Sequence, residues 1–108
     1  MCCADITRTI WTGKNPSKDF LEVYLTVFEA QKKAIGEIRA GVKGREINAV
    51  SDEILLSKFN KRMLLHSLGH SLGNLVHEAG AGLSIKEKRK LAPGQIVTVE
   101  PGVYFPGK

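Results

Sequence analysis

Cysteine is scarce in this sequence: Cys2 and Cys3 are the only two among 108 residues. Adjacent cysteines rarely bond to each other, because a disulfide needs a particular Cα separation and Cβ direction. We therefore expect no disulfide framework and a reducing, cytoplasmic environment. Long apolar runs are also missing, since no stretch approaches the roughly 18 consecutive apolar residues that span a bilayer. We expect no membrane partner.

The chain has an excess of positive charge, formally +5, but lacks a long run of one sign. Its densest run, residues 86–90 (Lys-Glu-Lys-Arg-Lys), contains an acid and is typical of a solvated helix face or loop. Aromatic residues make up only 6% and form no regular series, so the stacking platforms of single-strand binders are missing. We expect no nucleic-acid partner.

The composition that remains is that of a globular domain, with 43% hydrophobic and 25% charged residues. Apolar residues recur every three or four positions between residues 17 and 39, which predicts an amphipathic helix that stops at Gly41. A weaker pattern predicts a second helix over 46–59. Runs of β-branched residues predict strands over 2–11 and 95–100.

All three histidines, His66, His70 and His77, fall in one segment that glycines interrupt, where short strands and tight bends are expected. Imidazole binds divalent metals and titrates near neutral pH, so the cluster indicates a metal or acid–base site, with ordinary surface histidines as the alternative. His77-Glu78 is not followed by a second histidine at the spacing of the helical H-E-x-x-H zinc motif. His66 and His70 have a spacing that could share a helix face, but Gly69 and Gly73 argue against a helix there. Bringing His77 beside the other two requires a bend, which we expect at Gly73.

Two carboxylates are candidates for the same site. Glu100 ends the predicted strand over 95–100 and precedes the turn at 101–102, so it can project into a cleft or face solvent. Asp5 lies in the predicted first strand, and from its position alone it could equally be a surface or turn residue.

Four segments together resemble the ordered motifs of the creatinase, prolidase and methionine aminopeptidase family. They are residues 4–9 (Ala-Asp-Ile-Thr-Arg-Thr), 65–73 (Leu-His-Ser-Leu-Gly-His-Ser-Leu-Gly), 76–80 (Val-His-Glu-Ala-Gly) and 97–104 (Val-Thr-Val-Glu-Pro-Gly-Val-Tyr). The first and last are more similar to Xaa-Pro aminopeptidases and prolidases than to methionine aminopeptidases. Ser71 and Gly80 depart from the family, which commonly has Gly and Pro there.

The resemblance implies a role for each candidate. Asp5 matches the bridging aspartate of a two-metal site, His70 its histidine ligand and Glu100 the first of its two glutamates. His77 matches the histidine that contacts substrate and stabilises the tetrahedral intermediate. His66 matches a further substrate-side histidine of the Xaa-Pro branch.

Two divalent metal ions are the implied cofactors. Carboxylates that bridge two ions hold a water between them, lower its pKa and leave a hydroxide to attack a peptide carbonyl. Oxygen-rich ligation with one imidazole favours Mn²⁺, with Co²⁺, Zn²⁺ or Fe²⁺ as alternatives.

The implied fold is α+β: part of a pita-bread fold, with helices packed on a curved, mainly antiparallel sheet. Residues 1–108 are expected to be a C-terminal catalytic-domain fragment that is incomplete at both ends. One further aspartate would precede them and one further glutamate would follow them. Exposed strand edges and exposed apolar surface are the expected consequence.

The predicted function is that of an Xaa-Pro metallopeptidase, which releases the N-terminal residue before proline from a peptide substrate. We expect a homodimer in the full-length parent and little activity from this chain alone. Two alternatives stay open at this point. One is a non-enzymatic pita-bread module that binds peptides or protein partners, and the other is a methionine aminopeptidase.

Overall fold

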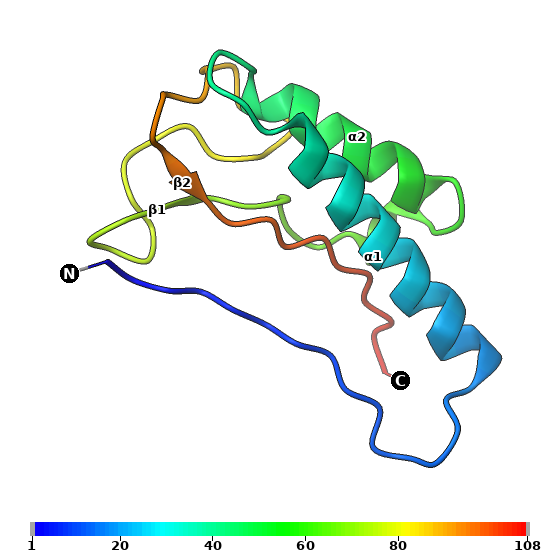
Figure 1. The fold of residues 1–108 in the computed structure, drawn as a ribbon. Helices are drawn as coiled ribbons and strands as arrows, with labels where there is room; N and C mark the ends of the chain where they lie inside the picture. The colour runs from blue at the N-terminus through cyan, green and yellow to red at the C-terminus, as the bar shows by residue number, and fades with distance from the viewer. Residues whose placement is uncertain (1, 108) are drawn as a thin grey trace.

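The computed structural model describes residues 2–107, which form two helices packed beside a small sheet (Figure 1). The elements in chain order are α1 (Lys18–Glu37), α2 (Gly44–Leu56), the 3₁₀ helix η1 (Lys61–Met63), β1 (Ser71–Leu72) and β2 (Ile96–Val97). The N-terminal segment runs extended past the strands before it turns into α1. The predicted α+β class is confirmed.

Helix α1 confirms the helix predicted over 17–39. Ser17 caps it, since its hydroxyl accepts a hydrogen bond from the Phe20 N–H at 3.1 Å. The side chains buried most deeply are small, Thr26, Ala30 and Ala34, which lets α2 approach closely. The helix ends at Glu37, before the stop predicted at Gly41, which lies in the following turn with a φ of 89°, a conformation that glycine adopts without strain.

Helix α2 begins two residues before the range predicted for it and ends at Leu56 rather than Phe59. Gly44 at its first position is buried against the chain around Gly82, and a Cβ there would collide with the Gly82 carbonyl oxygen. Residues 82–89 therefore pack onto the start of α2, a contact that helical periodicity does not reveal.

The sheet is antiparallel, with Ser71 opposite Val97 and Leu72 opposite Ile96. Hydrogen bonds extend this pairing beyond the two short strands, because the Thr98 and Glu100 N–H groups donate to the carbonyls of residues 70 and 68 at 2.9 and 2.6 Å. On its other edge the same segment pairs with Leu83, whose N–H and C=O both bond to Gly69. Residues 68–72 are thus the middle of three extended segments.

One strand prediction was wrong and a second was too long. Residues 2–11 form no strand, because their backbone contact with the sheet is one hydrogen bond, from the Cys3 N–H to the Gly73 carbonyl at 2.7 Å. The strand predicted over 95–100 is shortened to β2. Its regular pairing ends at Thr98, whose hydroxyl accepts the hydrogen bond of the His70 N–H at 3.0 Å.

The core lies between the helices and the extended segments. Its buried members are Ala34, Ile47, Leu68, Ala81, Leu83 and Leu91, with Ile38, Val42, Val97 and Val99 packed against them. Outside this core, α1 leaves large apolar side chains exposed, as expected: Leu25 is 57% and Phe28 50% accessible. Within residues 2–107, no helix is both long and apolar enough to cross a membrane.

The glycine at the start of α2 provides a test of this packing. Gly44→Ala should lower the free energy of unfolding by up to about 3 kcal/mol, because the added methyl group has no space beside the Gly82 carbonyl. Urea denaturation measures the change. Gly36→Ala in α1 is the matched control: apart from the adjoining helix backbone, nothing lies within 4 Å of its new methyl group, so it should stabilise by up to about 1 kcal/mol. Equal effects of the two substitutions would contradict the packing argument.

Glu87 holds residues 82–89 against the start of α2 through hydrogen bonds. The Glu87 side chain is 11% exposed. Its carboxylate accepts hydrogen bonds from the Arg89 guanidinium, the Arg89 N–H and the Gly82 N–H. The backbone carbonyl of Glu87 accepts a hydrogen bond from the Arg45 N–H in α2. The Arg89 side chain, then the Arg89 backbone, lower the pKa of Glu87 from 4.5 to about 2. The folded protein therefore favours the ionised carboxylate.

This shift predicts the direction of the acid sensitivity. The unfolded chain takes up the proton first as the pH falls, so the contribution of Glu87 is complete above pH 4.5 and is lost towards about pH 2. Glu87→Gln should reduce the pH dependence of the unfolding free energy in that window. Denaturation at a series of pH values tests it, with the exposed Glu53→Gln in α2 as control. An unchanged slope in Glu87→Gln would refute the assignment.

Candidate metal centre

Three side chains that are distant in sequence meet at one end of the sheet. Asp5, His70 and Glu100 each direct a potential ligand atom to a common point, and these atoms all lie within 4.8 Å of one another. The Nε2 atom of His70 is 3.3 Å from Asp5 Oδ2 and 3.1 Å from Glu100 Oε1. The side chains are 29%, 23% and 38% exposed for Asp5, His70 and Glu100, so the site is sheltered but accessible.

The donor atoms of this cluster match what a cation needs. His70 Nδ1 lies 3.1 Å from the Ser71 carbonyl, which can only accept, so Nδ1 carries the proton. Nε2 is then the ring atom that faces the two carboxylates. Glu100 Oε1 is buried and accepts no hydrogen bond from the described residues. Three electron-pair donors facing one another, one of them unsatisfied, fit a divalent ion.

Asp5 reaches this point from the N-terminal segment. Besides its backbone bond to Gly73, Cys3 directs its thiol to the Asn74 carbonyl at 3.4 Å, so Cys3 is anchored beside the bend that follows β1. Two residues further along, the Asp5 carboxylate faces His70. The position of Asp5 thus depends on a tether at Cys3 rather than on a continuous strand.

The other two ligand candidates are positioned by the paired backbones of residues 68–72 and 96–100. A Cβ on Gly69 would overlap the Thr98 carbonyl, so glycine permits the close approach next to His70. On the Glu100 side, the Gln31 side chain of α1 donates to the Val99 carbonyl at 3.0 Å. The two ligand-bearing segments are therefore packed against each other, and α1 holds the second of them.

His77 lies against His70, with ring centroids 4.1 Å apart and an angle of 34° between the rings. The bend expected at Gly73 is present over residues 73–77. Glu78 closes it: its N–H donates to the Ser71 carbonyl, and its carboxylate accepts from the Leu75 N–H at 3.1 Å. This bend places the exposed His77 ring beside the donor cluster.

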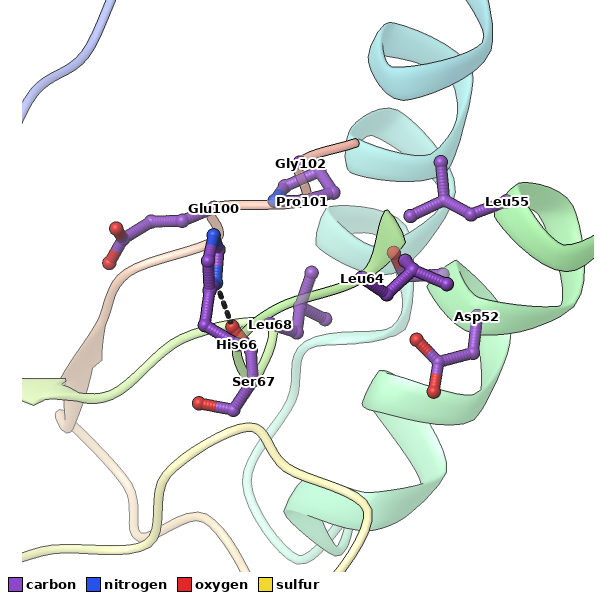
Figure 2. A pocket seen from close by; sticks show the side chains of 10 residues that line it. Asp52, Leu55, Leu64, His66, Ser67, Leu68, Glu100, Pro101 and Gly102 are labelled. Carbon is purple, nitrogen blue, oxygen red and sulfur yellow. Dashed lines mark hydrogen bonds between the residues drawn. The ribbon is translucent and has the colours of Figure 1, made fainter. Parts of the chain in front are cut away.

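His66 lies next to Glu100 (Figure 2). Both residues line a small cavity together with Asp52, Ser67, Leu68 and Pro101. His66 Nε2 is 2.5 Å from the Tyr104 hydroxyl, and the two rings meet edge to face. The structure thus brings all five predicted site residues to one region, and their chemical roles stay predictions.

Several residues that shape the site were not singled out in the sequence. Tyr104 belongs to the motif at residues 97–104, but its position in the sequence did not predict its hydrogen bond to His66. Gln31, Asn48 and Asp52 are ordinary polar residues of helices, and only tertiary contacts reveal that they face the ligand segments. Burial raises the pKa of Asp52, which the hydrogen bond from Asn48 opposes.

The fold and the site define a class. An oxygen-rich donor set with one imidazole, open to solvent and flanked by two further histidines, is the arrangement of enzymes in which divalent metals assist hydrolysis.

Sequence comparison identifies the family. The chain matches metallopeptidase family M24 over residues 1–108, and it belongs to this family. It is 42% identical over 104 residues to an uncharacterised peptidase of Bacillus subtilis and 36% identical over 103 residues to the Xaa-Pro dipeptidase of Pyrococcus furiosus. These alignments cover 96% and 95% of this chain and 29% of each relative.

Solved structures agree. The Xaa-Pro dipeptidase of Bacillus anthracis superposes with a TM-score of 0.91 at 42% identity, covering 98% of this chain. The X-Pro aminopeptidase of Thermotoga maritima gives a TM-score of 0.91 at 40% identity, covering 99%. The chain spans 29% and 30% of these two proteins. The resemblance seen in the four motifs is confirmed, and membership of a metallopeptidase family implies divalent metal ions.

The donor cluster predicts a metal-affinity change. In the protein at its natural length, Glu100→Gln should weaken Mn²⁺ binding at least about tenfold, because it removes one negative charge and replaces an acceptor oxygen with an amide. Isothermal titration calorimetry measures the affinity. Glu53→Gln, an exposed position of α2, makes the same chemical change away from the cluster and should leave the affinity unchanged. Equal affinities of the two variants would exclude Glu100 as a ligand.

Proposed function

We propose that these residues form part of the catalytic domain of a metal-dependent Xaa-Pro peptidase, which releases the residue that precedes proline at the N-terminus of a peptide. The observation that carries the proposal is the convergence of Asp5, His70 and Glu100 within 4.8 Å. Relatives named Xaa-Pro dipeptidase, 36% and 37% identical to this chain, support the choice of substrate class.

The proposed cofactor is a pair of divalent ions, with Mn²⁺ first and Co²⁺ or Zn²⁺ as alternatives. Such ions would supply Lewis-acid activation of a water and of the scissile carbonyl. Asp5 and Glu100 would hold them through carboxylate oxygens and His70 through Nε2. The protonated Nδ1 of His70, directed at the Ser71 carbonyl, keeps Nε2 free for that purpose.

The two remaining histidines are proposed to act on the substrate. His77 is exposed beside the cluster, where its ring can donate a hydrogen bond to an oxygen that becomes negative during peptide cleavage. His66 shares its Nε2 with the Tyr104 hydroxyl, so this pair can bind a polar group of the peptide from the Glu100 side.

The proposal also includes the parts of the enzyme outside residues 1–108. Because the chain spans 29% of the relatives it matches, the remaining ligands of a five-residue metal site would come from outside residues 1–108. The sheet described here would then be one portion of a curved antiparallel pita-bread sheet. We propose a cytoplasmic homodimer for the whole enzyme and no hydrolysis by residues 1–108 alone.

The activity test uses the protein at its natural length with Mn²⁺. It should hydrolyse Ala-Pro and leave Met-Ala largely intact, lose activity with a chelator, and lose at least about a hundredfold in kcat/KM on His70→Ala, because a metal ligand is removed. Release of free amino acid measures the rate.

The exposed Glu53→Gln serves as a control and should retain activity. Faster cleavage of Met-Ala than of Ala-Pro would replace the proposed specificity with that of a methionine aminopeptidase. Chelator-resistant peptide binding without hydrolysis of either substrate would favour a non-enzymatic binding module.

A further inference from the structure

Asn48 is a polar side chain buried between α2 and the segment that carries His70. It is only 4% exposed. Its Oδ1 accepts a hydrogen bond from the Leu68 N–H at 3.2 Å, and its Nδ2 donates to Asp52 Oδ2 at 2.8 Å. The amide therefore joins one turn of helix to the backbone of a segment twenty residues further along the chain.

Leu68 connects this contact to both ligand candidates. It precedes His70 by two residues, and its carbonyl accepts the hydrogen bond from the Glu100 N–H at 2.6 Å. The N–H of Leu68 is thus held by Asn48, and its C=O holds Glu100. In Figure 2 the segment with Leu68 lies between Asp52 on α2 and Glu100, whose carboxylate points away from the helix.

Asp52 fixes which way the Asn48 amide points. The Leu68 N–H can only donate, so it requires the oxygen of the amide, and the amide nitrogen is then left facing Asp52. The Asp52 carboxylate accepts from that nitrogen and so opposes a flip of the amide.

Secondary structure alone does not require this arrangement. Asn48 lies within α2 and not at its cap. Asparagine is an indifferent helix former at such an interior position. The Asn48 side chain instead bonds to a different segment. Buried polar contacts of this kind select one packing geometry over others. Here the geometry selected is the position of the ligand-bearing segment against α2.

We propose that Asn48, oriented by Asp52, is a positioning residue that fixes the separation of His70 and Glu100 and thereby sets the affinity of the site for a divalent ion. This inference rests on the proposed metal site. It adds that the affinity depends on a helix residue that contacts neither the ion nor the substrate.

The test compares variants of the protein at its natural length. Asn48→Leu keeps the approximate size but removes the acceptor for the Leu68 N–H. The double variant Asn48→Asp/Asp52→Asn exchanges the two side chains. The new carboxylate at position 48 can accept from the Leu68 N–H, and the new amide at position 52 can donate to that carboxylate. Ala34→Gly, in the core on α1, destabilises the fold without removing a hydrogen-bonding group of this network and controls for stability.

The first measurement is the binding of Co²⁺, followed by its visible absorption spectrum and titrated in folded protein. Asn48→Leu should weaken binding about tenfold or more and change the spectrum, the double variant should recover most of the affinity, and Ala34→Gly should bind as the parent does. Equal binding by Asn48→Leu and the parent overturns the inference while leaving the metal site intact.

The second measurement needs no metal. In chelated protein, amide hydrogen exchange at Leu68 and Glu100 should be faster in Asn48→Leu than in Ala34→Gly of equal stability, and slow again in the double variant. Unchanged exchange overturns the positioning role. A parent that binds no Co²⁺ but shows this exchange pattern refutes the proposed metal site and retains the positioning.

Discussion

The structure depends on the backbone hydrogen bonding of residues 68–72. This segment uses both of its edges, pairing with Leu83 on one side and with residues 96–100 on the other. Because buried N–H and C=O groups must find partners, the three segments can pack on the helices only together. The core residues Leu68 and Leu83, and Val97 packed against them, come from these segments, so hydrogen bonding and apolar burial reinforce each other.

The two helices contribute to the site through amide side chains rather than through ligands. Gln31 of α1 holds the carbonyl of Val99, next to Glu100, and Asn48 of α2 holds the N–H of Leu68, near His70. Each contact lies within two residues of a ligand candidate. The two helices, which pack beside the sheet, thus determine where the two ligand-bearing backbones meet.

Sequence reasoning captured what is encoded locally. The spacing of apolar residues was enough to predict α1, and the position of Gly73 between His70 and His77 was enough to predict a bend. The limits of the strands were not predictable, because β2 stops where the Thr98 hydroxyl replaces a carbonyl in the pairing. The assignment of Asp5 came from a family resemblance, since no local pattern connects it to His70.

The N-terminal segment gives the site an unusual thermodynamic character. Among the described residues, one backbone hydrogen bond, at Cys3, joins residues 2–11 to the sheet, yet Asp5 supplies one of three converging donors. An ion bound by all three would act as a cross-link that closes the loop from Asp5 to His70. Part of the ion's binding free energy would be used to order the N-terminal segment. A change that makes this segment more ordered without the ion would therefore raise the ion affinity.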